Sequence, residues 1–195
     1  MKKILLHVCC APCAIYVARK LIDDNFEVAL FFYNPNIHPE EEYHRRKHEV
    51  EKLSQKYNLE LIISPYKPEE WLKKVQNLED CSEGGERCRV CYDMRIEDTA
   101  RYASINDYDL FASTMTISPH KNATTINQIG REIADKINNE IESGLFKAKK
   151  VEFFEADWKK HDGFKIACGL SHDEGYYRQD YCGCIYSKQR LTEKI

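Results

Sequence analysis

Clustered cysteines are the feature of this sequence that most directly indicates chemistry. Of the nine cysteines in 195 residues, seven fall in three groups along the chain: Cys9, Cys10 and Cys13; Cys88 and Cys91; Cys182 and Cys184. In a reducing compartment structural disulfides are rare, and grouped cysteines more often bind metal or carry out redox chemistry. Cysteine also fills core space as a small hydrophobe. We expect this of Cys168 in "KIACGL", whereas Cys81 lies in a polar stretch that fits either role.

The spacing within the groups indicates how their sulfurs can be used. Cys88-x-x-Cys91 enters a helical pattern, so both sulfurs can point the same way within one turn. Cys9 and Cys10 are adjacent and would face opposite sides of a regular strand. Because Pro12 follows so closely, we expect the strand to end there and a helix to begin, whose free amides and positive dipole end favour thiolates.

Several metal and redox sites fit these groups. Four thiolates from Cys9, Cys10, Cys88 and Cys91 would satisfy a [4Fe–4S] cluster, whereas a structural zinc site would leave three grouped cysteines unexplained. A Cys-x-Cys pair is cramped for one tetrahedral metal, but it can form a redox-active dithiol or ligate an extra metal. The candidate ligands of such a second metal are Cys13, Cys182, Cys184, Asp93 and Asp180. The alternative for the two aspartates is that they are solvated helix carboxylates.

Composition predicts one ordinary domain without a membrane span. The chain is 43% apolar and 31% charged, and no window approaches 18 consecutive apolar residues. The apolar run after Met1 is soon interrupted by His7 and is too short for a signal peptide, so we expect a cytoplasmic protein. The net charge of −3 does not indicate a nucleic-acid binder, but residues 43–49, 147–150 and 157–165 are locally basic. A local patch is enough to contact RNA phosphates, although a solvated helix face would look the same.

Strand and helix patterns alternate along most of the chain. Strands are predicted at 2–8, 26–34, 59–66 and 108–115, and helices at 12–25, 38–58, 68–78, 92–106 and 118–140. Residues 79–91 read as a loop that contains two glycines. After residue 150 we expect a short strand, a polar loop and one or two helices around 171–191.

This order predicts an α/β, Rossmann-like fold with a mainly parallel sheet and helices on both faces. We expect one domain over 1–195, in which residues 151–195 form a C-terminal extension whose helical segment closes the site. Ligands of such sheets bind beyond the carboxyl ends of the strands. That rule places residues 7–13, 33–39 and 113–122 on one rim.

Five motifs together give the sequence a family resemblance. They are "HVCCAPC", "GERCRVCYDMR", "TMTISPHKN", "FFEADWKKHDGFK" and "YYRQDYCGCIYS". In this combination, from the first strand to residue 187, the chain resembles the QueH-type epoxyqueuosine reductases. The resemblance implies a fold of the adenine-nucleotide α-hydrolase-like (HUP) type. "HVCCAPC" stands where the related PP-loop enzymes carry a Ser-Gly-Gly-x-Asp-Ser phosphate loop, so ATP pyrophosphatase chemistry is not expected.

The resemblance also implies an activity and a set of roles. The activity is the last step of queuosine formation: reduction of the epoxide of epoxyqueuosine at the wobble position of tRNAs with a GUN anticodon. An electron donor that the sequence does not identify would supply the electrons. Carried onto this chain, Cys9, Cys10, Cys88 and Cys91 would hold a [4Fe–4S] cluster, and Cys182 with Cys184 would form the redox-active pair. An additional iron beside the cluster, with cysteine and aspartate ligands, is also implied.

The reaction and its substrate add further candidate residues. Removal of the epoxide oxygen as water takes two electrons and two protons, and the candidate proton donors are His7, His120 and Tyr181. Asp180 completes the catalytic candidates, as a ligand of the additional iron. Bases splayed from an anticodon loop stack on aromatic side chains, and the candidates for this role are Tyr33, Tyr176, Tyr177 and Tyr181. Candidates for phosphate contacts are Arg87, Arg89, Lys121, Lys159, Lys160 and Arg178, and those for a base edge are Asn34 and Asn122.

Two other functions fit the cysteines. A non-catalytic iron–sulfur electron carrier or redox sensor would have an exposed cluster and no deep pocket. A metal-free thiol oxidoreductase would use the Cys-x-Cys and Cys-x-x-Cys pairs as exchanging dithiols.

Overall fold

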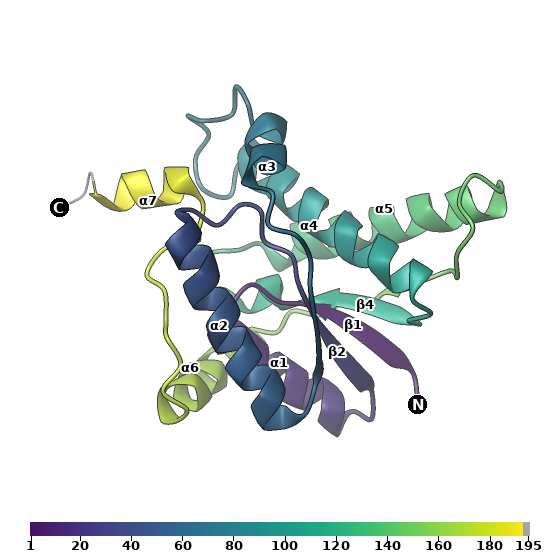
Figure 1. Cartoon of the computed structure of the whole chain (residues 1–195), viewed down its shortest axis with the longest axis horizontal. Helices are drawn as coiled ribbons and strands as arrows, with labels where there is room; N and C mark the ends of the chain where they lie inside the picture. Colours follow the sequence, from purple (N-terminus) through teal and green to yellow (C-terminus); the bar gives the residue numbers. More distant parts are fainter. Residues whose placement is uncertain (193–195) are drawn as a thin grey trace.

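A five-stranded, all-parallel sheet forms the centre of the protein in the computed structural model, which describes residues 1–192 (Figure 1). The strand order is β3-β2-β1-β4-β5. The strands are β1 (Lys3–His7), β2 (Glu27–Phe32), β3 (Glu60–Ile63), β4 (Leu110–Ser113) and β5 (Glu152–Phe153). Each neighbouring pair is parallel. The predicted α/β class is therefore confirmed, and the sheet is parallel throughout.

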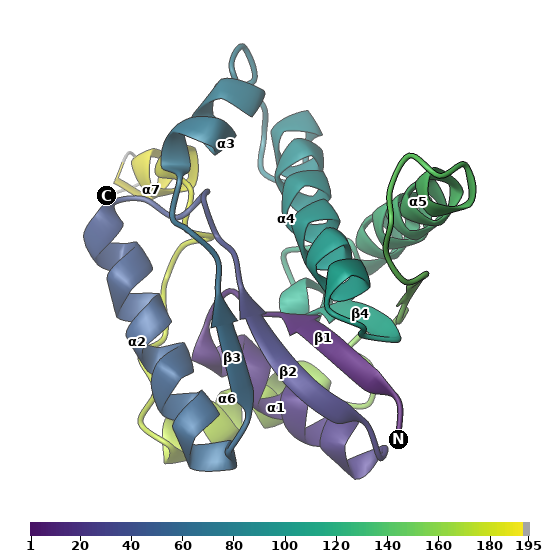
Figure 2. The same ribbon diagram turned by 45° about the vertical axis from the view of Figure 1, so that its right-hand side comes forward.

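Helices cover both faces of the sheet. One face is covered by α1 (Ala11–Asp23), α2 (Glu40–Tyr57) and α6 (Gly163–Asp173), and the other by α4 (Glu86–Ile105) and α5 (Ala123–Glu142) (Figure 2). The shorter helices are α3 (Pro68–Lys74), the 3₁₀ turn η1 (Thr114–Ile117) and α7 (Ile185–Thr192). No helix within residues 1–192 combines the length and the apolar character that a membrane crossing requires.

Successive apolar side chains of each strand point to opposite faces of the sheet, which explains why helices cover both faces. In β1, Leu5 packs into the core beneath α4 and α5, whereas its neighbours Ile4 and Leu6 pack into the core beneath α1 and α2. Phe31 and Phe32 of β2 divide between the same two cores. Successive side chains of a strand point to opposite faces, so strands that are apolar at every position require a helical layer on each side.

The order of the strands determines where a ligand can bind. From β1 the chain moves outward to β2 and β3, and it then returns to place β4 on the other side of β1. In doubly wound sheets the ligand crevice lies at this reversal, beyond the carboxyl ends of the two strands. Here those ends are followed by Val8–Cys13 and by the segment from Thr114 to Asn122.

Two elements differ from the sequence expectation. Helix α4 begins at Glu86, not after Cys91, so both cysteines of the second group lie on the helix. In the C-terminal region a helix forms earlier than expected, at Gly163–Asp173, and residues 174–184 form no helix or strand. The positive φ angles of Gly175 (65°) and Gly183 (119°) interrupt helical geometry in this segment. We call residues 174–184 the strap; it runs beside α2 in both views (Figures 1 and 2).

Candidate active site

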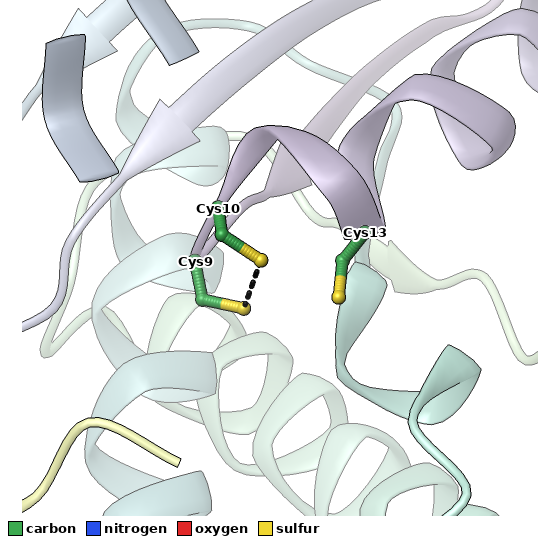
Figure 3. Close-up of side chains that lie close together, drawn as sticks. All are labelled: Cys9, Cys10 and Cys13. Carbon is green, nitrogen blue, oxygen red and sulfur yellow. Dashed lines mark hydrogen bonds between the residues drawn. The ribbon is translucent and has the colours of Figure 1, made fainter. Parts of the chain in front are cut away.

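The first cysteine group lies where β1 ends and α1 begins. Cys10 is the residue before α1 and has an extended backbone, with φ −170° and ψ 156°. Pro12 follows in the first turn of the helix. This abrupt change of geometry brings the sulfurs of Cys9, Cys10 and Cys13 to within 4.8 Å of one another, and those of Cys9 and Cys10 are 3.7 Å apart (Figure 3).

These three thiols perturb one another strongly. Contacts with Cys10 and Cys13, aided by the positive charges of Arg95 and Lys121, hold the pKa of Cys9 well below its usual range despite burial. Contacts with Cys10 and Cys9, together with burial, raise the pKa of Cys13. These contacts favour the thiolate form of Cys9, and the thiolate is the form of cysteine that binds metals.

The second group lies on the first two turns of α4. Cys88 and Cys91 are three residues apart and so share one face of the helix. The backbone N–H of Gly84 donates to the sulfur of Cys88 at 3.3 Å, and the φ of +85° at Gly84 is one that glycine adopts readily. Burial raises the pKa of both thiols.

The third group belongs to the strap and the start of α7. Cys182 faces a cavity, whereas Cys184 is buried and accepts a hydrogen bond from the backbone N–H of Ser187 at 3.3 Å. Burial raises the pKa of Cys184 to about 12. Gly183 between them has a φ of 119°, and a Cβ there would lie 3.0 Å from Nη1 of Arg46.

Buried Arg46 of α2 holds the strap in place. Its guanidinium donates to the carbonyls of Cys182 (3.1 Å) and Tyr181 (3.2 Å), and its Nε donates to Glu42 at 2.6 Å. The segment after β2 adds two further bonds. The N–H of His38 donates to the carbonyl of Gly183 at 2.7 Å, and the hydroxyl of Tyr181 donates to the carbonyl of His38 at 2.6 Å.

A second buried arginine, Arg95 of α4, lies among all three cysteine groups. Its Nη1 is 3.9 Å from the sulfur of Cys91. Burial alone lowers the pKa of Arg95, but the thiols of Cys91, Cys9 and Cys182 raise it overall. One cysteine from each group therefore acts on the charge of the same guanidinium, and Cys9, Cys13 and Cys182 line one cavity.

A cavity of about 760 Å³ opens beside the sulfurs. Its walls come from the start of α1, the segment between β4 and α5, helix α6, and the strap. The predicted site residues that line it are Cys9, Cys13, His120, Lys121, Arg178, Asp180, Tyr181 and Cys182. The volume lies within the range typical of small-ligand sites, which argues against an exposed carrier cluster without a pocket.

Other predicted residues lie away from the cavity wall. Asp93 is exposed on α4, and because it is two residues from Cys91 it faces away from that cysteine. Tyr33 is buried in the core, and Asn34, also buried, bonds to the Val8 carbonyl and Arg95. Asn122 caps α5 by accepting from the N–H of Thr125 at 3.1 Å.

Tyr177 and half of the proposed phosphate contacts have structural partners. Tyr177 lies against α2, where its hydroxyl bonds Glu42 and its N–H bonds Glu49. Tyr176 packs at the edge of the core beneath α1 and α2. Arg87 is buried and donates to two carbonyls of the preceding loop, Arg89 pairs with Glu132, and Lys159 donates to the carbonyls of Thr116 and Lys121.

Sequence reasoning missed four residues of the site. Arg95 was detectable, because a residue four positions after Cys91 on a helix lies over it. Arg46 and Gln179 gave no local signal; the amide of Gln179 donates to the sulfur of Cys10 at 3.0 Å, across 169 residues of chain. Cys168, expected in the core, lies on the cavity wall and is partly exposed.

Comparisons with known proteins agree with this geometry. Residues 4–190 match the family model described as Epoxyqueuosine reductase QueH. Proteins of that name from Streptococcus pyogenes serotype M1 and Thermotoga maritima are 37% and 34% identical to the chain. The first match covers 94% of this chain and 69% of the relative, and the second covers 100% and 94%.

A solved structure with a similar fold is the U34-tRNA thiolase NcsA from Methanococcus maripaludis with its [4Fe–4S] cluster. The TM-score is 0.55 at 13% sequence identity, over 99% of this chain. The chain spans 65% of the length of that thiolase. At this identity the likeness concerns the fold alone.

Proposed function

This chain belongs to the QueH family of epoxyqueuosine reductases, and on that premise we propose that it reduces the epoxide of epoxyqueuosine in tRNA to give queuosine. The observation that carries the proposal is that cysteines of the first and third groups line one cavity, while Cys91 of the second group contacts Arg95, on which Cys9 and Cys182 also act. Such a site combines electron-carrying sulfurs with room for a nucleobase. We infer that the substrate position is the wobble base of tRNAs with a GUN anticodon, and that this is the last step of queuosine formation.

We assign the cofactor as a [4Fe–4S] cluster held by Cys9, Cys10, Cys88 and Cys91. The chemistry of the donor set fits it, because these thiols are fully or largely buried and two of them accept N–H donors, from Gly84 and Gln179. Hydrogen bonds to ligand sulfurs are one of the levers by which a protein tunes such a centre. Candidate ligands of an additional iron are Cys13, Cys182, Cys184 and Asp180. Asp93 is left out because it is exposed.

When bound, the cluster supplies single electrons, and an additional iron supplies a Lewis acid for the epoxide oxygen. The chain's own contribution is a second source of electrons. Oxidation of the Cys182 and Cys184 thiols to a disulfide releases two electrons and two protons, which balances loss of the epoxide oxygen as water. Asp180, beside this pair on the cavity wall, completes the catalytic assignment.

His120 is our choice of proton donor to the leaving oxygen. It lines the cavity, and its ring has no hydrogen-bond partner within residues 1–192. His7 is buried, and burial together with Arg95 lowers its pKa to about 3, so it is neutral and carries no spare proton at physiological pH. The hydroxyl of Tyr181 is occupied by the carbonyl of His38.

The substrate base must leave the anticodon loop to enter the cavity. We infer that it stacks on Tyr181 and that Arg178 contacts an adjacent phosphate, since both line the cavity. Residues 151–195 act in this assignment as an extension that packs over the metal site. A tRNA substrate and thiols kept reduced support a cytoplasmic location, with an external electron donor that restores the dithiol.

The test is turnover of epoxyqueuosine-containing tRNA by anaerobically purified protein. We expect iron at about four or more atoms per chain and broad absorbance near 400 nm, as four-iron clusters give. Changing Cys182→Ser or Cys184→Ser should abolish turnover while the colour remains, whereas Cys168→Ser should retain both. Active protein without iron would indicate a metal-free thiol oxidoreductase, and coloured wild-type protein without turnover would indicate a carrier or sensor. Full turnover by both serine variants would refute the assigned redox pair.

A further inference from the structure

Arg95 is a buried cation without an acidic partner. It is 2% exposed, and its Nη2 donates to Asn34 Oδ1 at 2.8 Å and its Nε to His7 Nε2 at 3.3 Å. Its remaining polar contact is the Cys91 sulfur at 3.9 Å. Within residues 1–192, no carboxylate oxygen lies within 4.0 Å of the guanidinium. Its partners among oxygen and nitrogen atoms are thus uncharged.

Another buried arginine of the same protein has the acidic partner that a buried cation usually has. Arg46 is 1% exposed, and its Nε lies 2.6 Å from the Glu42 carboxylate. Isolated buried charges are costly, and proteins normally pair them or use them to bind a charged group. The buried charge of Arg95 therefore needs an anion, and the groups around it that can supply one are sulfurs.

Lys121, which is partly exposed on the cavity wall, is a second cation near the cysteines. It lines the cavity together with Cys9 and Cys182. No Asp or Glu in the described part of the chain forms an ion pair with it. Two cations, Arg95 on α4 and Lys121 in the loop before α5, therefore lie beside cysteines of the three groups.

We propose that Arg95 and Lys121 are the built-in counter-charges of the iron–sulfur centre and hold its reduction potential up by electrostatic attraction. This rests on the proposed function, because it assumes that a cluster binds here. A [4Fe–4S]²⁺ core with four thiolates carries a double negative charge, which two fixed cations match. Reduction adds one more negative charge to the centre, so nearby positive charge favours the reduced form, and net charge is a recognised determinant of cluster potentials.

Arg95 is then a positioning residue with two separable effects. Its charge acts on the whole centre, whereas its N–H groups orient Asn34, His7 and Cys91. The variant Arg95→Lys preserves the charge and loses most of the hydrogen bonds. The variant Arg95→Gln loses the charge and keeps an N–H donor. Comparing the two variants therefore distinguishes charge from geometry.

The experiment is a potentiometric titration of anaerobically purified protein, followed by the electron paramagnetic resonance signal of the reduced cluster. For Arg95→Gln we expect the ratio of reduced to oxidised cluster at a fixed potential to fall about tenfold or more, which is a negative shift of at least about 59 mV for a one-electron couple. Lys121→Gln should shift the potential in the same direction, and Arg95→Lys should stay close to the wild type. Arg101→Gln is the matched control, since it lies on the same helix but pairs with Glu97 and Glu140.

Each result supports or overturns a defined part of the proposal. A wild-type potential in both glutamine variants would overturn it, and so would an equal shift in Arg95→Lys and Arg95→Gln, because geometry would then outweigh charge. If Arg95→Gln does not fold, the shift in Lys121→Gln decides. Wild-type protein without any cluster would instead refute the proposed cofactor, so the two failures are distinguishable.

Discussion

Arg46 donates a hydrogen bond of 3.1 Å to the carbonyl of Cys182 across 136 residues of chain. This contact ties helix α2 to the strap that carries the third cysteine group. The guanidinium and its partner Glu42 are both buried, with side-chain exposures of 1% and 9%. A charge pair inside the protein therefore helps to hold the strap, together with the hydrogen bonds of His38 and Tyr177.

Replacing Arg46 should loosen the strap. We expect Arg46→Met to reduce the free energy of unfolding by up to about 3–5 kcal/mol, because it removes the positive charge beside the buried Glu42 carboxylate and leaves it the hydrogen bond from Tyr177. Urea denaturation measures this change, and limited proteolysis at residues 174–184 reports the strap directly. The double variant Arg46→Met/Glu42→Met should recover part of the stability. Equal stability of the wild type and the single variant would show that the pair does not hold the strap.

Gly183 should not tolerate a side chain. At a φ of 119° and with a Cβ 3.0 Å from Arg46 Nη1, Gly183→Ala combines backbone strain with a clash. We expect a loss of about 1–3 kcal/mol in the free energy of unfolding, the usual range for such strain. Gly169→Ala is the control: no atom lies within 4 Å of its Cβ position on α6, and alanine there should stabilise by about 0.5–1 kcal/mol. Similar thermal unfolding of both variants would contradict the predicted strain.

Glu97 should make stability depend on acidic pH. Burial alone raises the pKa of its carboxyl, but hydrogen bonds from Lys136 and Arg101 hold it below its usual range. The stabilisation is therefore present above the unfolded pKa of about 4.3 and is lost as pH falls through the folded value.

We expect Glu97→Gln to lower the free energy of unfolding by up to about 1 kcal/mol at pH 7, since its partners are partly exposed, and by less at pH 3, where more of the carboxyl is protonated. Glu142→Gln, which removes an exposed pair with Lys150, should change little at either pH. Urea denaturation at the two pH values provides the measurement. An equal loss of unfolding free energy in Glu97→Gln at pH 3 and at pH 7 would mean that the Glu97 side chain contributes by packing and not by charge.

Cys13 provides a separate test of the additional iron. If it ligates that iron, Cys13→Ser should lower the iron content by about one atom per chain while the absorbance near 400 nm of a four-iron cluster remains. Cys168→Ser on the same cavity wall should leave the iron content unchanged. Loss of all the colour in Cys13→Ser would place Cys13 among the cluster ligands instead.

The fold was largely predictable because its signals are local. The apolar runs around Leu5 and Phe31 identify buried parallel strands, and the pattern of alternating elements implies the sheet and its rim. The C-terminal region was predicted less well. Helix α6 begins after a left-handed Asp162 with no side-chain cap, and the strap owes its course to Arg46 and His38, which lie far away in sequence.

For the candidate site, too, local motifs were informative and contacts between distant residues were not. Short motifs located every cysteine group and the cavity residues His120 and Tyr181. They failed for Tyr33 and Asn34, where proximity to the rim in sequence was taken for exposure to the substrate. The burial of Asn34 depends on tertiary neighbours such as Arg95, which a single sequence does not reveal. Asn122 is exposed, but its side chain caps α5 through the local contact with Thr125.

The strap has a consequence for how the protein is made. Synthesis proceeds through Cys9, Cys10, Cys88 and Cys91 before it reaches Cys182, 91 residues after Cys91. At about 5–20 residues per second, the nascent chain holds the first four thiols for roughly 5–18 seconds without the segment that later covers them. During that interval the cavity wall that the strap provides is missing, so the site is completed only when the C-terminal residues have been synthesised.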